Sequence, residues 1–327
     1  MRVGIVGAGL IGNKRAQFLG GAELVAVADV VEERAKELGK KHGCKYTTDW
    51  KEVVSDDSVD IIFDSTTNDY LALVAIEALK NGKHVLIEKP CARNPKELLG
   101  IIREAKRHPD LKVKAGFNHR FHPAIMKAKE IFGGGEIGEL MYIRGRYGHG
   151  GRKGYEREWR AKPEIAGGGE LLDQGIHLID LSRFFAGEFE EAVGHVGTMF
   201  WDMAVEDNGF ALLKNKKGQI AFLHSSWTEW KNLFSFEVFC KYGKLEVNGL
   251  GGSYGEETLT YYKMKSEMGI PDKFVYAFPG EDNSWALEFK NFVDAINGKS
   301  KISGSLQDAY AAIKLIFDIY DWSRKRK

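Results

Sequence analysis

Over the first 117 residues, short apolar runs alternate with longer stretches whose apolar residues recur at helical spacing. The runs predict strands at residues 3–6, 24–28, 59–63, 84–87 and 113–117, and the intervening stretches predict helices, for example at residues 70–79 and 96–105. Strands that alternate with helices form right-handed crossovers and a parallel sheet covered on both faces. The pattern predicts a doubly wound α/β domain at residues 1–121.

The pattern changes after Pro123. A predicted helix at residues 124–132 precedes strand-like runs at residues 140–147, 209–213, 220–226, 234–240, 244–247 and 258–262, and helices are predicted at residues 284–296 and 305–323. Turn signals such as Lys217-Gly218 separate several of the strands, as hairpin connections require. We expect residues 122–327 to form an α+β domain with one large, mostly antiparallel sheet. The last helix is a candidate to pack back on the first domain.

Composition adds few constraints. The formal net charge is +1, with 28% charged and 43% hydrophobic residues, which is typical of a globular protein and gives no reason to expect nucleic acid or a membrane surface as a partner. No apolar run is long enough to span a bilayer, and a signal-type segment is not recognisable, so we expect a cytoplasmic protein. The three cysteines are widely spaced and form no CxxC motif, so we expect reduced thiols.

A GxGxxG motif at residues 7–12 lies between the first predicted strand and the helix after it. In a dinucleotide-binding fold, Gly7 makes the tight turn, Gly9 lets the backbone approach a pyrophosphate, and Gly12 lets the helix pack closely on the strand. The second predicted strand ends at Asp29, at the place of the acidic residue that accepts hydrogen bonds from the ribose hydroxyls. These features predict a Rossmann-type cofactor site.

The residues after Asp29 bear on the choice between NAD and NADP. A carboxylate at this position repels a 2′-phosphate, and Val30 and Val31 offer no cation to neutralise one. NAD is therefore the expected cofactor. Arg34, about one turn into the next helix, is the residue that keeps NADP open.

Two further segments carry ionisable residues in suggestive places. Lys89 directly follows the fourth predicted strand, at the carboxyl edge where doubly wound sheets bind ligands, although a lysine there can equally be solvent-exposed. In GGGELLDQGIHLID, residues 167–180, a helix would place Asp173, His177 and Asp180 on one face. Such a face is either catalytic or merely solvated, and the three glycines would give substrate and cofactor a side-chain-free approach to the start of the helix.

Together these segments resemble the Gfo/Idh/MocA oxidoreductases, the family of glucose-fructose oxidoreductase and inositol dehydrogenase. The resemblance rests on GAGLIG at residues 7–12, Asp29, GKHVLIEKP at 82–90, GFNHRFHP at 116–123 and GGGELLDQGIHLID at 167–180. It implies an NAD-dependent dehydrogenase or reductase that transfers a hydride between a ring alcohol or ketone and nicotinamide C4. The implied substrate is sugar-like, namely a sugar, an inositol, a uronate or a nucleotide sugar.

The resemblance also implies roles for individual residues. Lys89, Asp173 and His177 match the catalytic trio, in which His177 takes the alcohol proton, Lys89 shares this role, and Lys89 and Asp173 hold substrate hydroxyls. The implied cofactor-binding residues are Gly7, Gly9, Leu10, Ile11, Gly12, Asp29, Thr66, Asn68, Glu88 and Lys89. The implied substrate-binding residues are Lys89, Asn118, Arg120, Trp159, Arg160, Asp173 and His177.

Some of these roles have alternatives. Arg120 could instead form a structural salt bridge, and Asp180 could be structural or a partner of His177. Thr67 and Leu71 stand where the family commonly has a proline and a histidine, so any role of that histidine is missing here.

Residues 144–162 hold seven cations, Arg144, Arg146, Arg152, Lys153, Arg157, Arg160 and Lys162, against Glu156 and Glu158. Interleaved with Tyr147, Tyr155 and Trp159, this segment suggests an anionic or nucleotide-linked sugar held by arginines and aromatic rings. The alternatives are a solvated loop and contacts with a partner subunit.

Other functions remain open at this point. An NAD-dependent glycosidase of the same fold, and a non-catalytic sensor of a dinucleotide or sugar, are the alternatives to a dehydrogenase. His119 and His122 do not complete a recognisable set of metal ligands, so we expect no metal. The large second sheet is a natural dimerisation surface, and the resemblance implies a homodimer or homotetramer.

Overall fold

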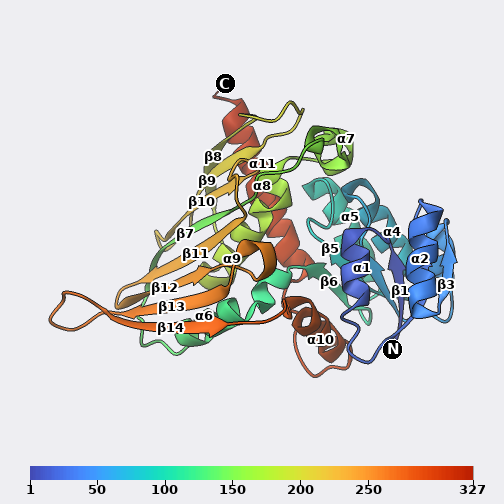
Figure 1. The fold of residues 1–327 in the computed structure, drawn as a ribbon, viewed down its shortest axis with the longest axis horizontal. Coiled ribbons are helices and arrows are strands. Elements are labelled where there is room, and N and C mark those ends of the chain that lie inside the picture. Colours follow the sequence, from blue (N-terminus) through green and yellow to red (C-terminus); the bar gives the residue numbers. More distant parts are fainter. Residues whose placement is uncertain (327) are drawn as a thin grey trace. The chain divides into compact units, whose positions relative to one another are not determined.

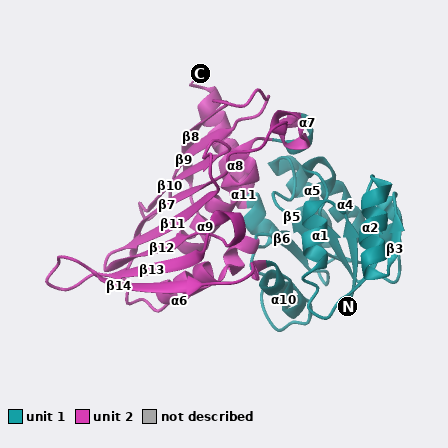
Figure 2. Cartoon of the chain, viewed as in Figure 1, with its two compact units in different colours: residues 1–117, 164–167, 285–310 teal, residues 118–163, 168–284, 311–327 magenta. Residues whose placement is uncertain are grey.

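The computed structural model describes residues 1–326, which form two compact units (Figures 1 and 2). Unit 1 consists of residues 1–117, 164–167 and 285–310, and unit 2 consists of residues 118–163, 168–284 and 311–327. The chain therefore returns to unit 1 after most of unit 2 has been built.

Unit 1 contains a six-stranded parallel sheet in the order β3-β2-β1-β4-β5-β6. Its strands are β1 (Arg2–Val6), β2 (Glu23–Ala28), β3 (Lys45–Thr47), β4 (Ile61–Asp64), β5 (His84–Glu88) and β6 (Val113–Gly116). Its helices are α1 (Leu10–Ala16), α2 (Glu32–His42), α3 (Trp50–Ser55), α4 (Asn68–Lys80), α5 (Pro95–Arg107) and most of α10 (Ser284–Ile296). The prediction of a doubly wound parallel sheet is confirmed. Strand β3 was not predicted, because three residues at an exposed edge are too few to show a period.

Helices cover both faces of this sheet. Val3 and Ile5 lie in an apolar cluster on one face, which also contains Phe289 and Phe292 of α10. Gly4, between them, faces the other side, where a Cβ would lie 2.7 Å from Val53 of α3. The core of the N-terminal sheet is thus completed by aromatic residues from near the C-terminus.

Unit 2 contains an eight-stranded sheet in the order β14-β13-β12-β11-β7-β10-β9-β8. Its strands are β7 (Leu140–Gly148), β8 (Glu191–Gly197), β9 (Asn208–Lys214), β10 (Ile220–Ser226), β11 (Leu233–Cys240), β12 (Gly243–Asn248), β13 (Glu257–Lys263) and β14 (Asp272–Phe278). Only β7 and β10 pair in parallel, so the prediction of one large, mostly antiparallel sheet is confirmed. The edge strands β8 and β14 were not predicted, because neither shows a regular alternation of buried and exposed positions.

The helical elements of unit 2 are η1 (Asn118–Phe121), α6 (Pro123–Gly133), η2 (Tyr155–Arg157), η3 (Trp159–Ala161), α8 (Glu170–Asp173), α9 (Gly175–Ala186), η4 (Gly252–Tyr254) and the greater part of α11 (Leu306–Arg324). The short helix α7 (Pro163–Ala166) lies where the chain passes from unit 2 to unit 1.

The two faces of the eight-stranded sheet differ in character. Gly145 of β7 faces α9, where a Cβ would lie 3.1 Å from Leu178. The alternate residues of β7, Tyr142, Arg144 and Arg146, point to the opposite face and are exposed. One face of the sheet therefore positions α9, and the other is open.

Candidate active site

The glycine motif forms a cradle at the carboxyl end of β1. Gly7 has φ +94°, and a Cβ on it would lie 2.4 Å from the carbonyl oxygen of Ser65. A Cβ on Gly12 would lie 1.9 Å from the carbonyl oxygen of Gly7, whereas a Cβ on Gly9 would have nothing within 4 Å. The first and third glycines thus let the chain pack on itself, and the second leaves the open approach that a pyrophosphate requires.

The carboxylate of Asp29 organises the loops around the cradle. Its Oδ2 accepts a hydrogen bond from the amide of Ala8 at 2.8 Å, and its Oδ1 accepts one from the amide of Val31 at 2.8 Å. A carboxylate has about four lone-pair sites, so two ribose hydroxyls can still donate to it. Val30 beside it is 79% exposed. The cradle and Asp29 therefore fit an NAD molecule.

The loop after β4 is fixed within unit 1. Thr66 donates from its hydroxyl to Oδ1 of Asp64 at 2.7 Å, and the side-chain amide of Asn68 donates to the carbonyl of Ala166 at 2.8 Å. Leu71 is completely buried in α4, so the place of the missing histidine is filled by a core residue. Contacts from Thr66 and Asn68 to a cofactor stay predictions.

Glu88, expected near the cofactor, belongs to a buried ion cluster. Its Oε1 accepts from Nε of Arg15 at 2.7 Å, and Nη1 of Arg15 donates to Glu288 of α10 at 2.5 Å. Burial lowers the pKa of the Arg15 guanidinium, but Glu288 and Glu88 outweigh burial and hold that pKa above its ordinary value. The cluster anchors the end of β5 directly before Lys89, which is joined to Pro90 by a cis peptide bond.

The expected helix over residues 167–180 is divided in two. Helix α8 ends at Asp173, Gln174 is a turn residue, and α9 begins at Gly175. His177 therefore lies in the first turn of a new helix, and its amide donates to the carbonyl of Gln174 rather than to that of Asp173.

The glycines at the start of α8 serve packing by this chain, which differs from the free approach expected for them. A Cβ on Gly168 would lie 2.3 Å from the hydroxyl of Tyr320, and one on Gly169 would lie 2.0 Å from the carbonyl oxygen of Glu206. The carboxylate of Glu206 accepts hydrogen bonds from the amides of Gly169 at 2.9 Å and Leu171 at 3.2 Å, and from the Tyr320 hydroxyl at 2.6 Å. Burial raises the pKa of Glu206. These contacts fix where α8 begins.

Asp173 and Arg160, both expected at the site, lie together. Nε of Arg160 is 3.2 Å from Oδ2 of Asp173, and its guanidinium lies 4.4 Å from the ring centroid of Trp159. Both charged side chains are partly exposed, at 28% for Arg160 and 18% for Asp173. The segment before the glycines thus places one cation beside the expected catalytic carboxylate.

His177 lies in an aromatic environment and is 4% exposed. Its imidazole stacks on that of His119, with ring centroids 3.7 Å apart and an interplanar angle of 21°. The ring of Tyr147 is 6.2 Å away, and burial together with Tyr254 and Glu170 raises the pKa of the Tyr147 phenol well above its ordinary value. The hydroxyl of Tyr254 accepts a hydrogen bond from Gln174 at 3.2 Å. The phenol of Tyr147 therefore stays neutral beside the imidazole pair.

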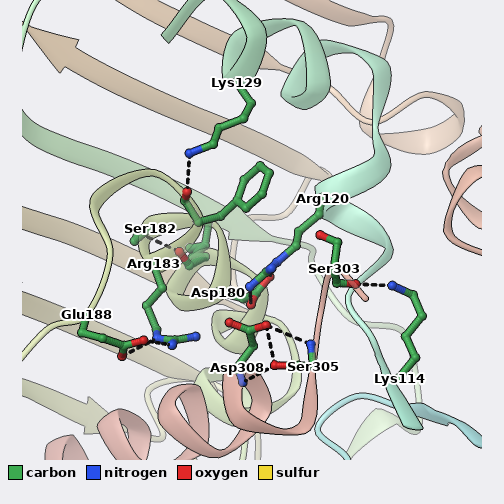
Figure 3. Close-up of polar contacts among 12 residues, drawn as sticks. Lys114, Arg120, Lys129, Asp180, Ser182, Arg183, Glu188, Ser303, Ser305 and Asp308 are labelled. Atoms are coloured by element: carbon green, nitrogen blue, oxygen red, sulfur yellow. Dashed lines mark hydrogen bonds and ion pairs between the residues drawn. The ribbon is translucent and has the colours of Figure 1, made fainter. Parts of the chain in front are cut away.

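Arg120 forms the salt bridge that the sequence left as one of its alternatives. Its Nε and Nη2 donate to the two carboxylate oxygens of Asp180 at 2.7 and 2.6 Å, and both residues are buried (Figure 3). The side-chain amide of Asn118 donates to Ser284 at 3.0 Å. Asp180 is thus a structural partner of Arg120, and contacts of Asn118 and Arg120 with a substrate stay predictions.

The basic segment at residues 144–162 is dispersed by the fold. Arg144 and Arg146 lie on the open face of the sheet, away from α9, and Arg144 bonds to Glu237. Tyr155 is only 3% exposed and packs against Trp227 and Val205, so it is a core residue and does not stack on a sugar. Arg144 and Arg146 therefore lie on the opposite face of the sheet from α9, whereas the anionic substrate stays a prediction.

Residues 1–326 contain neither a metal-binding cluster nor a membrane-spanning helix. Within that range, no group of three or more His, Cys, Asp or Glu residues is arranged to hold a metal ion. In the same range, no helix is both long enough and apolar enough to cross a membrane.

Comparison with known proteins covers both units. Residues 1–117 match the family model described as "Oxidoreductase family, NAD-binding Rossmann fold", and residues 125–246 match "GFO/IDH/MocA C-terminal domain". The first match shows that the cradle belongs to an NAD-binding domain.

Curated relatives and solved structures agree with these matches. The chain is 28% identical to levoglucosan dehydrogenase of Pseudarthrobacter phenanthrenivorans, over 67% of this chain and 59% of that protein. It is 30% identical to scyllo-inositol 2-dehydrogenase (NAD(+)) of Bacillus subtilis, over 92% of this chain and 88% of that protein. A solved structure of levoglucosan dehydrogenase in complex with NADH superposes with a TM-score of 0.89 at 22% identity, covering 100% of this chain and 98% of the other, which shows a shared fold.

Proposed function

We propose a reaction for this chain from one premise: it belongs to the Gfo/Idh/MocA family of NAD-binding oxidoreductases. The reaction is the NAD-dependent interconversion of a ring secondary alcohol and its ketone on a sugar-like substrate. The observation that carries the proposal is the coexistence of an NAD cradle in unit 1 with Asp173 and His177 on consecutive helices of unit 2.

The residues of this chain divide the work between binding and proton transfer. Gly7, Gly9, Gly12 and Asp29 hold NAD, which supplies a hydride acceptor at nicotinamide C4 when it is bound. His177 accepts the proton of the alcohol hydroxyl as the hydride leaves, because a hydroxyl proton and a hydride must both be lost when an alcohol becomes a ketone.

The remaining site residues hold the substrate. Asp173 accepts a hydrogen bond from a substrate hydroxyl, and Arg160 pairs with that carboxylate and orients it. Lys89 donates to a second hydroxyl and shares the proton transfer with His177. Trp159, whose ring lies under the Arg160 guanidinium, borders the same region.

We propose a neutral ring polyol as the substrate class. Arg160, the cation of the basic segment beside Asp173, is already paired with that carboxylate, and two of the other cations lie on the far face of the sheet. The relatives named for levoglucosan and scyllo-inositol point the same way. An anionic or nucleotide-linked sugar is the alternative that a substrate panel tests.

The test is a panel of sugars, inositols, uronates and nucleotide sugars, assayed for NADH and NADPH formation by absorbance. We expect the highest kcat/KM with NAD and an uncharged cyclic polyol. The variants Lys89→Ala, Asp173→Asn and His177→Ala should each lose most of this activity. Full activity in Lys89→Ala and His177→Ala would overturn the catalytic assignment.

The same panel separates the other function classes. Release of a sugar from a glycoside without net NADH would identify a glycosidase. Binding of NAD and a sugar without turnover of either would identify a sensor.

We further propose that the chain is a cytoplasmic homodimer or homotetramer that associates through the open face of the eight-stranded sheet. Apolar residues on this face include Tyr142 at 42% and Phe222 at 49% exposed. Light scattering measures the subunit count, and Phe222→Glu should reduce it. An unchanged mass in that variant would place the interface elsewhere.

A further inference from the structure

A second histidine lies face to face with His177. His119 comes from η1, at the start of unit 2, and its ring is parallel to that of His177 within 21°, at 3.7 Å between centroids. Phe234 packs on His119 in a T-shaped arrangement with ring centroids 5.8 Å apart, and the tilted ring of Tyr147 lies 5.2 Å from His119 between centroids. The His177 ring is therefore held on one face by another imidazole that the reaction does not itself require.

A directed chain of hydrogen bonds fixes the proton on His119. Ser284 donates from its hydroxyl to Oδ1 of Asp282 at 2.5 Å, since a carboxylate can only accept. The Ser284 oxygen then accepts from the side-chain nitrogen of Asn118 at 3.0 Å. This leaves the Asn118 carbonyl oxygen facing Nδ1 of His119 at 3.1 Å.

The direction of the chain decides the tautomer. Because the Asn118 oxygen can only accept, Nδ1 of His119 must carry a hydrogen, and the neutral ring has its lone pair on Nε2. Reversing the Asn118 amide would place its oxygen against a serine oxygen whose hydrogen already points to Asp282. Four residues therefore determine the protonation of a ring that contacts the expected proton acceptor.

We infer that His119 is a positioning residue for His177. The hydrogen-bond chain from Asp282 holds His119 as the Nδ1–H tautomer. The stacked His119 ring fixes the plane of the His177 ring and allows only one of the two imidazoles to be charged at a time. Two imidazolium ions stacked in a buried site would repel each other strongly. A proton accepted by His177 therefore requires a neutral His119. The catalytic part of this inference rests on the proposed function, whereas the tautomer and the shared charge do not.

The other ionisable groups around the pair are few. His122 lies 5.4 Å from the His119 ring, with its Nδ1 2.9 Å from Glu257 and its Nε2 3.9 Å from Asp282. On the His177 side, the Tyr147 phenol is 6.2 Å away between ring centroids. Asp173 and Glu170 lie on α8, the helix before α9, and both act electrostatically on Tyr147. The two rings are stacked at 3.7 Å between centroids, so a second charge on the pair would lie directly against the first.

The experiment is ¹⁵N NMR of histidine-labelled full-length protein, titrated from about pH 8 to about pH 5. His119→Phe and His177→Gln assign the two signals, and exposed His195 of β8, which lies outside the stacked pair, serves as an internal reference signal. We expect His119 as the Nδ1–H tautomer at high pH and uptake of no more than one proton by the pair. An Nε2–H tautomer, or both rings fully charged at the acid end, would overturn the inference.

Two variants test each part separately. Ser284→Ala removes the link to Asp282, and we expect His119 to become a mixture of tautomers. His119→Phe keeps a stacked ring but removes the competing site, and we expect His177 to take up the proton alone and to be more fully charged at acid pH than in the wild type. An unchanged tautomer in Ser284→Ala, or an unchanged His177 titration in His119→Phe, would contradict the respective part.

Activity measurements then connect the stack to catalysis. With the best substrate, His119→Ala should lower kcat by about tenfold to hundredfold, with the KM for NAD unchanged, because the proton acceptor loses its orientation. His119→Phe should restore most of kcat and shift the acid limb of the pH profile. If His177→Ala is fully active, the proposed function fails while the NMR result stands. If the NMR result fails while His177→Ala is inactive, only the role of His119 is lost.

Discussion

The cofactor cradle of unit 1 and the proposed catalytic cluster of unit 2 are built by different means. The cradle is formed by backbone atoms of residues 7–12, where glycines have no side chain to obstruct close packing. The Asp29 carboxylate supports it by accepting a hydrogen bond from Ala8. The proposed catalytic cluster depends on side chains brought together from η1, β7, α9 and η4, and on Gln174 between α8 and α9. The effect of a substitution in the cradle therefore depends on the space available to the new Cβ. The effect of a substitution in the cluster depends on the side chain that loses its partner.

The largest expected effect is in the cluster. His177→Ala should lower kcat by about 10²- to 10⁴-fold, the usual contribution of a general base, while the Kd of NADH stays within about twofold of wild type. Steady-state rates and fluorescence titration measure the two quantities. His195→Gln, at an exposed position of β8, is the matched control and should change neither.

The next largest effect is expected at the buried salt bridge between Arg120 and Asp180. Arg120→Met leaves the Asp180 carboxylate buried without its main partner and should lower the free energy of unfolding by about 3–5 kcal/mol. The double variant Arg120→Met/Asp180→Leu removes both charges and should recover most of that loss. Urea unfolding measures all three proteins. Equal destabilisation in the single and double variants would mean that shape, and not charge pairing, dominates there.

Two alanine substitutions sharpen the contrast within the cradle. Gly9→Ala has room for its Cβ, so folding should be unchanged, while the Kd of NAD rises about tenfold because the pyrophosphate loses its close approach. Gly12→Ala forces a Cβ onto the Gly7 carbonyl oxygen and should lower both Tm and NAD affinity. If the two variants behave alike in a thermal melt, the assignment of space around these glycines is wrong.

The smallest expected effect concerns cofactor choice. Asp29→Ala removes the acceptor for the ribose hydroxyls and for the amides of Ala8 and Val31, so the Kd of NAD should rise about tenfold. The Kd of NADP should change less, because the repulsion of its 2′-phosphate is also removed. Asp29→Asn keeps one acceptor oxygen, so its Kd for NAD should lie between those of the wild type and Asp29→Ala. Isothermal titration with both cofactors gives the comparison.

The contrast also explains how far the sequence could be interpreted. The cradle was predicted because its parts are adjacent in the chain and each glycine has one steric reason to be there. The parallel strands β1, β2, β4, β5 and β6 were predicted from alternation alone, whereas the three-residue β3 was not.

Partners across the fold were not predictable in the same way. Arg15 and Glu288 are 273 residues apart, and no local period marks them as a pair. His119 was seen only as an incomplete metal ligand, although its neighbour Asn118 and the distant Ser284 determine its tautomer. The glycines at residues 167–169 were predicted to leave an opening for ligands, because the sequence does not show that Arg93, Tyr320 and Glu206 lie against them.

The return of residues 285–310 to unit 1 has a consequence for how the protein is made. A ribosome releases the first 117 residues long before Phe289, Phe292 and Glu288 emerge, so the nascent N-terminal sheet lacks part of its core and Arg15 lacks one of its two carboxylates. The half of the enzyme that is synthesised first is therefore completed last. Binding of NAD during translation should depend on emergence of residues 285–310, which makes cofactor loading a late step of biogenesis.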